Sequence, residues 1–294
     1  MTGTTPVRKA ITRTRPGRAL AHRFVAGDTL DDAVEVAHSL NDQGFTVSLD
    51  LLGEEVHDKE TALAAVDRYL VCLDRIAAER LDANISVKPT HLGLAVSTDL
   101  AAESIDRLAT RAAEVGTTVT IDMEDSRYTE GTVDMYATGQ QAHGNLGLAL
   151  QACMKRTPED LDRLLPLGGH IRLCKGAYLE PPEVALTTKR QVGIAYSDLL
   201  RTLMGATGVK PAVATHDDEL IDLAVELAGN RSEPFEFQML YGVRPDLQRG
   251  LVSAGYPLRV YLPFGSEWYP YLTRRLAERP ANTWFFVRAL FGGR

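Results

Sequence analysis

The sequence lacks several features that would place it outside a reducing cytoplasm. Its 294 residues contain no apolar run long enough to cross a membrane and no apolar signal core near the amino terminus. Cysteine is scarce: Cys72, Cys153 and Cys174 are odd in number, widely spaced and form no C-x-x-C pair, which argues against a disulfide framework and a thiolate metal site. A basic excess is missing too, because the net charge is -7. We therefore expect a cytoplasmic protein without a nucleic-acid partner.

The first 23 residues differ from the rest of the chain. They contain no acidic residue and carry the basic side chains of Arg8, Lys9, Arg13, Arg15, Arg18 and Arg23. This composition predicts a mobile basic arm over residues 1–23; the alternative is a short helix that packs on the body or touches anionic lipid. Residues 24–294 are expected to form a single domain, since the chain is 45% hydrophobic and of a length that one domain can reach.

Short β-type runs alternate with helical patterns through this domain. The β-type runs cover residues 45–52, 84–88, 117–123, 147–152, 170–175, 212–215, 235–240 and 258–262, and helical patterns follow them, the longest over 183–204. Strict alternation implies parallel strands joined by right-handed crossovers. About eight such units predict an α/β fold of the closed (β/α)8 TIM-type barrel. An open doubly wound sheet is the alternative, although no G-x-G-x-x-G follows the first strand.

The stretch 261–282 reads YLPFGSEWYPYLTRRLAERPAN and marks a junction between a strand and a last helix. On that helix Tyr271, Arg274, Arg275 and Glu278 fall at i, i+3, i+4 and i+7, which places them on one face. Two adjacent guanidiniums could grip a small carboxylate bidentately. The alternative is a solvated ion-pair face, because Glu278 lies at ion-pair spacing from both arginines.

Polar residues also stand at the expected carboxyl ends of the strands, the face that carries the sites of this fold. In chain order they are Asp50, Lys88, Asp122, Glu124, Gln151, Arg172, Lys175, Thr215, His216, Glu236, Gln238, Tyr241 and Tyr261. Lys88 could join Arg274 and Arg275 in a positive pocket for a small acid, with Asp122 orienting one cation.

A second cationic set, Arg172 to Tyr178, reads RLCKGAY. Gly176 and Ala177 would let the backbone approach a ligand closely, while Arg172 and Lys175 meet its anionic atoms, a composition that suits a phosphate-bearing cofactor. In the alternative, Lys175 is an ion-pair partner of Asp122 or Glu236 at the barrel mouth.

Several ordered motifs carry a family resemblance over roughly residue 23 to the end. They are SLDLLGE at 48–54, SVKP at 86–89, IRLCKGAY at 171–178, ATH at 214–216, FQMLYG at 237–242 and the stretch 261–282. Together they resemble the landmarks of flavin-dependent proline dehydrogenase (proline oxidase), in the monofunctional bacterial form without an aldehyde dehydrogenase domain.

The resemblance implies an FAD-dependent flavoprotein that oxidises L-proline to 1-pyrroline-5-carboxylate, the first step of proline catabolism to glutamate. Hydride would pass from proline C5 to flavin N5, and electrons would leave to a quinone or other acceptor at the membrane. It further implies peripheral contact with the inner face of the cell membrane and a downstream 1-pyrroline-5-carboxylate dehydrogenase that takes the product. No metal, protein nucleophile or general base is expected.

By position in these motifs, the resemblance also assigns residues, including some on the last helix. The implied proline-binding residues are Lys88, Asp122, Leu240, Tyr261, Tyr271, Arg274 and Arg275. The implied FAD-binding residues are Gln151, Arg172, Lys175, Gly176, Ala177, Thr188, Lys189, Thr215, His216 and Glu278.

Two other readings compete with this one. A metal-dependent barrel enzyme acting on a sugar or keto acid would use the oxygen and nitrogen ligands of Asp122, Glu124, His216 and Glu236. A non-catalytic idea concerns the apolar tail 284–291, which could meet a membrane or a partner subunit, or else pack on the barrel.

Overall fold

The computed structural model describes residues 21–278, with the side chains of 274–278 excepted. Strands and helices alternate along it. In order, they are α3 (Leu30–Asn41), β1 (Thr46–Leu51), α4 (Lys59–Glu79), β2 (Ala83–Val87), α5 (Thr98–Glu114), β3 (Val119–Ile121), α6 (Ser126–His143), β4 (Leu146–Gln151), α7 (Thr157–Leu164), η1 (Leu165–Leu167), β5 (Gly169–Cys174), α8 (Lys189–Gly205), β6 (Val209–Ala214), α9 (Asp218–Ala228), β7 (Glu236–Leu240), α10 (Pro245–Ser253), β8 (Leu258–Phe264) and α11 (Trp268–Glu278).

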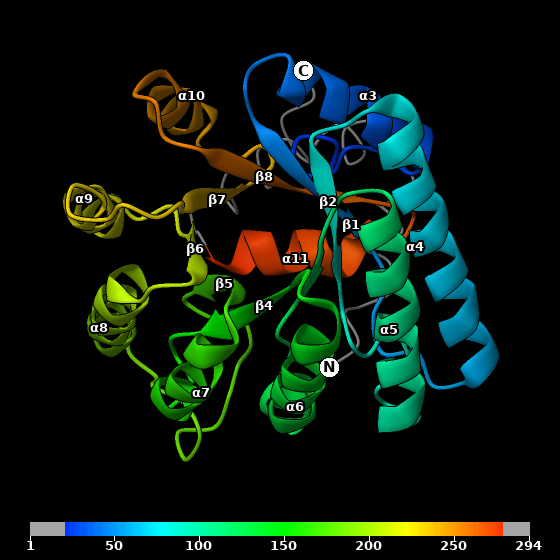
Figure 1. Cartoon of the computed structure of the whole chain (residues 1–294), viewed down its shortest axis with the longest axis horizontal. Coiled ribbons are helices and arrows are strands. Elements are labelled where there is room, and N and C mark those ends of the chain that lie inside the picture. The colour runs from blue at the N-terminus through cyan, green and yellow to red at the C-terminus, as the bar shows by residue number, and fades with distance from the viewer. Residues whose placement is uncertain (1–20, 279–294) are drawn as a thin grey trace, which may run out of the picture.

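The strands close into a parallel barrel in the order β1 to β8, surrounded by the helices (Figure 1). Closure is made by β8 pairing with β1, with Thr46 opposite Arg259 and Ser48 opposite Tyr261. The predicted (β/α)8 barrel is therefore confirmed, and the open doubly wound sheet is wrong.

The side chains at helix ends explain why the helices begin and stop where they do. Thr29 and Asp32 form a capping box at the start of α3, and the side chain of Asp58 accepts from the backbone N–H of Thr61 at the start of α4. Gly144 ends α6 in the left-handed conformation that glycine adopts without strain. Short polar residues thus fix the helix boundaries that orient the barrel strands.

Several strands present an apolar face to the helices and a polar face to the barrel interior. Val47 and Leu49 of β1 are fully buried in the main core, whereas Ser48 between them hydrogen-bonds the side chain of Asn84 on β2. Arg172 on β5 reaches Ser86 on β2, which is not a neighbouring strand, so both side chains point into the barrel. The interior is therefore polar, and the hydrophobic core lies between the barrel and its helices.

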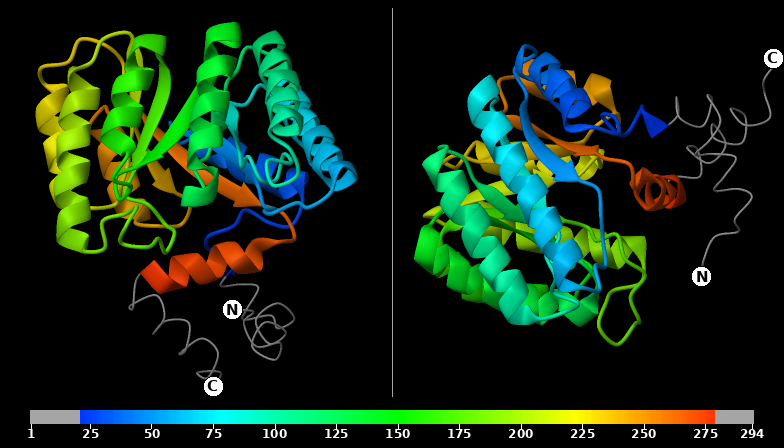
Figure 2. Two further views of the ribbon diagram at one scale, coloured as in Figure 1. Left: turned by 90° about the horizontal axis from the view of Figure 1, so that it is seen from below. Right: turned by 90° about the vertical axis from the view of Figure 1, so that its right-hand side faces the viewer.

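Helix α11 lies across the end of the barrel toward which the strands run (Figure 2). Its Tyr271 and Leu272 are buried against Ala21 and Phe24 from the start of the described chain. Pro270 falls in the first turn, where its missing N–H is tolerated, as predicted. The basic residues before Ala21 and the apolar tail 284–291 lie outside the described residues. Among the helices within 21–278, no segment combines the length and apolar character needed to cross a bilayer.

The helical pattern predicted over 183–204 is partly wrong, because α8 begins only at Lys189. The preceding residues form a loop in which Ala185 bridges to Met154 and the Leu186 N–H donates to the Cys153 carbonyl. The loop is also tied to α6, since Ser126 donates to the Glu180 carboxylate from its backbone N–H at 2.7 Å. These contacts hold the segment as a loop, with a turn at 182–184, along the barrel mouth.

Candidate active site

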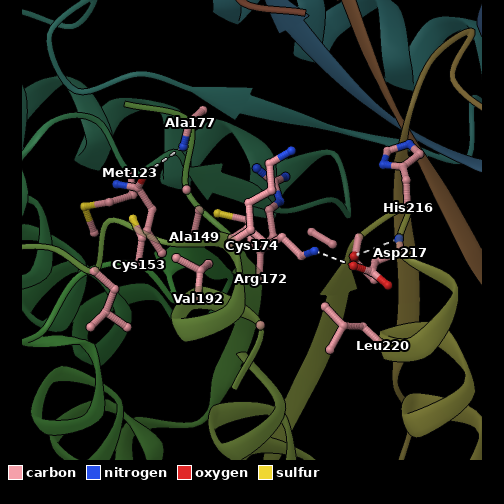
Figure 3. Close-up of a pocket in the computed structure, with 18 of the residues that line it drawn as sticks. Met123, Ala149, Cys153, Arg172, Cys174, Ala177, Val192, His216, Asp217 and Leu220 are labelled. Carbon is pink, nitrogen blue, oxygen red and sulfur yellow. Dashed lines mark hydrogen bonds and ion pairs between the residues drawn. The ribbon is translucent and has the colours of Figure 1, made fainter. Parts of the chain in front are cut away.

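A cavity of about 1600 Å³ opens at the carboxyl ends of the strands. Its lining includes every predicted site residue whose side chain is described, namely Lys88, Asp122, Gln151, Arg172, Lys175, Gly176, Ala177, Thr188, Lys189, Thr215, His216, Leu240, Tyr261 and Tyr271. Figure 3 shows Arg172 between a wall that carries Cys153 and Ala177 and another that carries His216 and Asp217. Arg274, Arg275 and Glu278 belong to α11, and their side chains lie outside the described residues.

Lys88 follows β2 and sits among acidic and phenolic groups. Its Nζ lies 2.7 Å from Asp50 Oδ1, 3.7 Å from Asp122 Oδ2 and 3.4 Å from the Tyr261 hydroxyl. Burial alone would lower the pKa of Lys88, but Asp50 and the other acidic neighbours outweigh it and raise that pKa. Lys88 is therefore a buried, charged ammonium with one proton directed at Asp50.

Asp50 was not assigned a role from the sequence, although it ends a strand in the SLDLLGE motif. The carboxyl group is fully buried, and its Oδ2 has no hydrogen-bond partner among the described residues. Burial raises the pKa of Asp50, and the nearby Lys88 only partly opposes the shift. The strand-end position was the signal available, but nothing in the sequence paired Asp50 with Lys88.

Asp122 follows β3 and connects several side chains above the barrel interior. It accepts hydrogen bonds from Arg172 Nη1, from Ser86 Oγ at 2.7 Å and from the Tyr261 hydroxyl at 2.6 Å. Burial would raise its pKa, but the charges of Arg172 and Lys88 outweigh burial and hold the pKa below its usual value. Asp122 is consequently an ionised carboxylate that orients Arg172.

Arg172 lies in the middle of β5 and is held on two edges. Besides Nη1, its Nε donates to Gln238 Oε1 at 2.5 Å, and its guanidinium carbon lies 5.3 Å from the centre of the Tyr261 ring. Its Nη2 has no hydrogen-bond partner within residues 21–278. We refer to Asp50, Lys88, Asp122, Arg172 and Tyr261 as the carboxyl-end cluster.

The loop after β5 approaches the cavity through Gly176. Its φ is +112°, and a Cβ there would lie 2.2 Å from Cys153 Sγ, so only glycine fits without displacement. Ala177 N–H donates to Gln151 Oε1 at 3.3 Å, and Gln151 Nε2 donates to the Glu124 carbonyl at 2.8 Å. These bonds fix the amide of Gln151 at the wall of the cavity.

Lys175 pairs with Asp217, with Nζ 2.5 Å from Oδ2. The alternative that Lys175 pairs with Asp122 or Glu236 is therefore wrong. Thr188 and Lys189 stand at the start of α8, where Thr188 Oγ1 accepts from the Gln191 N–H. A helix amino terminus beside a cationic side chain favours an anionic ligand group.

The other wall is formed where β6 and β7 end. His216 Nε2 accepts from the Leu240 N–H at 3.1 Å, which requires Nε2 to be unprotonated. Thr215 Oγ1 accepts from the Asp217 N–H at 3.2 Å. Both side chains are thus fixed at the cavity wall.

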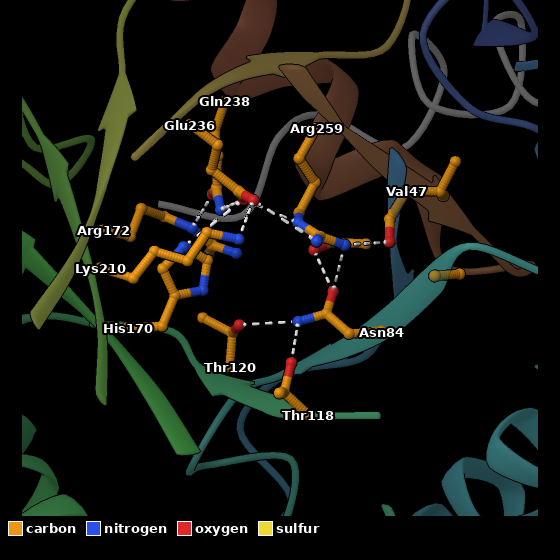
Figure 4. Close-up of polar contacts among 12 residues, drawn as sticks. Val47, Asn84, Thr118, Thr120, His170, Arg172, Lys210, Glu236, Gln238 and Arg259 are labelled. Atoms are coloured by element: carbon orange, nitrogen blue, oxygen red, sulfur yellow. Dashed lines mark hydrogen bonds and ion pairs between the residues drawn. The ribbon is translucent and has the colours of Figure 1, made fainter. Parts of the chain in front are cut away.

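Glu236 was expected at the carboxyl end of a strand, and this expectation is wrong. It is the first residue of β7, at the opposite end of the barrel from Asp122. There it binds Arg259 and Lys210 and lies near His170 (Figure 4). We call His170, Lys210, Glu236 and Arg259 the amino-end cluster. The four residues of the metal-dependent alternative are therefore not gathered at one site, and no other metal-ligating group of three or more was found among the described His, Cys, Asp and Glu side chains.

Known proteins resemble the chain over most of its length. The family model described as proline dehydrogenase matches residues 33–288. Proline dehydrogenase 1 of Bacillus subtilis is 38% identical over 273 residues, which cover 92% of this chain and 90% of that protein. Proline dehydrogenase of Deinococcus radiodurans is 35% identical over 282 residues, 93% of this chain and 91% of that protein.

Solved structures of proline utilization A (PutA) share the fold. The protein from Bdellovibrio bacteriovorus, inactivated by N-propargylglycine, matches with a TM-score of 0.83 at 23% identity, over 89% of this chain and 33% of that one. The D778Y mutant from Bradyrhizobium japonicum matches with a TM-score of 0.78 at 26% identity, over 93% of this chain and 32% of that one. This chain thus spans about a third of those proteins. With its confirmed barrel and the extent of the family match, the chain is an enzyme of the proline dehydrogenase family.

Proposed function

We propose that the chain oxidises L-proline to 1-pyrroline-5-carboxylate with bound FAD and passes the electrons to a quinone or another acceptor. The observation that carries this proposal is the carboxyl-end cluster: Lys88 and Arg172, buried and balanced by two aspartates, at one wall of a large cavity. In a chain of this family, that arrangement suits a small zwitterion held against a flat cofactor.

The residues present fit FAD. The cavity of about 1600 Å³ exceeds the roughly 300–1000 Å³ typical of small-molecule sites, as an elongated dinucleotide requires. The buried Arg172 Nη2 offers a donor without a partner in the described chain, and Gly176 permits close backbone approach. Lys175 and the amino terminus of α8 at Lys189 are suited to a diphosphate. The residues proposed to hold FAD are Gln151, Arg172, Lys175, Gly176, Ala177, Thr188, Lys189, Thr215, His216 and Glu278.

We assign binding of the proline carboxylate to Lys88, Arg274 and Arg275. Lys88 has three protons and directs one at Asp50 and a second, at 3.4 Å, at the Tyr261 hydroxyl, so the third remains for an incoming carboxylate. Tyr261, Tyr271 and Leu240 would wall the pyrrolidine ring, and Asp122 would keep Arg172 and Tyr261 in place. When FAD is bound, its N5 supplies the acceptor for the hydride from proline C5.

These residues act by positioning. A ring fixed by its carboxylate at one end presents its opposite carbon at a set distance, which lowers the entropic part of the barrier. No described side chain is needed to take the amine proton, for which solvent suffices. Contact with the inner face of the cell membrane for quinone access, and transfer of product to a 1-pyrroline-5-carboxylate dehydrogenase, belong to this proposal.

The test is the visible spectrum of the FAD-loaded protein during anaerobic addition of L-proline. We expect the flavin absorbance to bleach with L-proline and to persist with pyrrolidine, which has the same ring without the carboxylate. A spectrum unchanged by L-proline would contradict the proposed function, and equal bleaching by pyrrolidine would remove the carboxylate grip from it.

A further inference from the structure

The amino-end cluster is connected to the carboxyl-end cluster by one side chain. Glu236 Oε1 accepts from Arg259 Nε at 2.7 Å, and Oε2 accepts from Lys210 Nζ at 2.6 Å and from Arg259 Nη2 at 3.5 Å. Its Oε1 also accepts from Gln238 Nε2 at 2.8 Å, and Gln238 Oε1 accepts from Arg172 Nε at 2.5 Å (Figure 4). A continuous chain of hydrogen bonds therefore runs from Glu236 to the guanidinium at the cavity.

The charge of Glu236 is well defined although it is only 2% exposed. Burial by itself would raise its pKa, but Arg259 and the other cationic neighbours outweigh burial and hold that pKa below its usual value. Glu236 is consequently ionised at neutral pH, and an ionised carboxylate can only accept hydrogen bonds.

This fixes the orientation of the Gln238 amide. Glu236 on one side can only accept, and Arg172 Nε on the other side can only donate. With its NH2 toward Glu236 and its oxygen toward Arg172, Gln238 satisfies both neighbours; turned over, it would place donor against donor and acceptor against acceptor. The amide has a single satisfied orientation because the charged Glu236 can only accept while Arg172 Nε can only donate.

Arg172 in turn depends on this oxygen. Its Nη1 is anchored by Asp122 and Ser86, and its Nε by Gln238. Two anchors on different edges fix the plane of a guanidinium, whereas one anchor leaves it free to pivot. The anchors on Nη1 and Nε together therefore determine where Nη2 lies, and Nη2 is the nitrogen without a partner in the described chain.

We propose that Glu236 and Gln238 are positioning residues that set the orientation of Arg172, with Glu236 acting from the opposite end of the barrel through Gln238. The inference rests on the proposed function in that Arg172 faces the reacting molecules; neither Glu236 nor Gln238 needs to touch them. A merely structural role would instead limit both residues to the stability of the barrel.

The variants Gln238→Met and Glu236→Gln test the proposal, with Lys210→Met as the matched control. Methionine keeps the length of Gln238 without its amide, and Glu236→Gln removes the charge that orients it. Lys210→Met also removes a partner of Glu236, but from the oxygen that Gln238 does not use. All three are expected to lower the melting temperature.

The direct readout is the Nε–H signal of Arg172 in ¹⁵N-arginine-labelled, FAD-loaded protein, identified by its loss in Arg172→Lys. We expect this signal to shift and its hydrogen exchange to accelerate at least tenfold in Gln238→Met and Glu236→Gln, and to stay in place in Lys210→Met. An unchanged signal in Gln238→Met would overturn the proposal. This readout does not require turnover, so it can fail or succeed independently of the proposed proline oxidation.

The kinetic readout is kcat with L-proline. We expect Gln238→Met and Glu236→Gln to lower kcat about tenfold, the usual scale for one lost hydrogen bond, and Lys210→Met to leave it close to wild type. In an Arg172→Lys background the same two changes should lower kcat little further, because they act through Arg172. If the two changes lower kcat by the same factor in the Arg172→Lys background as in wild type, they do not act through Arg172. That result, or a loss of kcat no larger than in Lys210→Met, would limit Glu236 and Gln238 to a role in stability.

Discussion

The two ends of the barrel interior carry two buried ionic clusters that differ in how completely they are satisfied. In the amino-end cluster, each oxygen of Glu236 faces a cation, with Lys210 and Arg259 as partners. In the carboxyl-end cluster, Arg172 Nη2 and Asp50 Oδ2 have no partner among the described residues, and the cluster borders the cavity. The charged groups of the amino-end cluster are thus paired with one another, although His170 Nε2 lacks a hydrogen-bond partner among the described residues, whereas the carboxyl-end cluster borders the cavity and has capacity for a ligand. We therefore expect buried charge to support stability at one end and ligand binding at the other.

The largest effect should come from breaking the amino-end cluster at Arg259. We expect Arg259→Met to lower the free energy of unfolding by about 3 kcal/mol, because removing one partner leaves a buried charge less compensated. The kcat/KM with L-proline should stay close to wild type, since Lys210 and Gln238 still hold Glu236. Denaturant unfolding and steady-state kinetics measure both. A large loss of kcat/KM at full stability would reverse the comparison.

The matching change at the carboxyl end is Lys88→Met. We expect kcat/KM to fall by roughly 30- to 100-fold, as for the loss of a charged hydrogen bond of about 2–3 kcal/mol. Stability should change less than in Arg259→Met, because Asp50 can take up a proton: burial already raises its pKa. The same two measurements apply. Unaltered proline kinetics would remove Lys88 from the substrate grip.

The pH dependence of stability should have opposite signs at the two ends, beginning with Glu124 at the carboxyl end. Burial raises the pKa of Glu124 to about 7, against hydrogen bonds from Thr90 that lower it. A carboxyl with a raised folded pKa favours the fold while protonated, so stability is lost as pH rises from about 5 to 8, by about 2 kcal/mol. Unfolding curves at both pH values should show this loss in wild type and its absence in Glu124→Gln. Equal slopes for the two proteins would argue against it.

The smallest predicted effect concerns His170 in the amino-end cluster. Burial lowers the pKa of His170 to about 3, although Glu236 acts in the other direction. The unfolded chain binds the proton more readily, so stability is present above about pH 6.5 and is lost by about 2 kcal/mol as pH falls from 7 to 5. His170→Asn should flatten this acid limb in the same unfolding experiment. If the stability of His170→Asn falls between pH 7 and 5 as much as that of wild type, a group other than His170 causes the acid sensitivity.

The barrel fold could be predicted from the sequence because the alternation of strands and helices depends on local sequence patterns. Helix starts at Thr29 and Asp58 use short polar caps, and the strands are short apolar runs between turns. The helix expected over 183–204 was wrong at its start because Ala185 pairs with Met154, which holds that segment in a loop. Local propensity contains no information about such a partner.

The candidate site could be predicted from the sequence only in part. Motif positions placed residues such as Arg172 and Lys175 at one cavity, yet the partners of these side chains come from strands distant in sequence: Lys175 binds Asp217, and Lys88 binds Asp50. Glu236 was misplaced because a one-letter run does not show at which end of a short strand a residue falls. The role of the amide in Gln238 needed the distances to both neighbours.

The position of α11 has a consequence for how the enzyme is made. Tyr271 lines the cavity and packs in the same buried cluster as Ala21 and Phe24, so one wall of the cavity is supported by a segment almost 250 residues earlier in the numbering. On the ribosome, the barrel strands are synthesised before the helix that crosses their mouth. A nascent chain can therefore close its barrel while the pocket is still without this wall, and binding competence appears only after the last described helix has emerged.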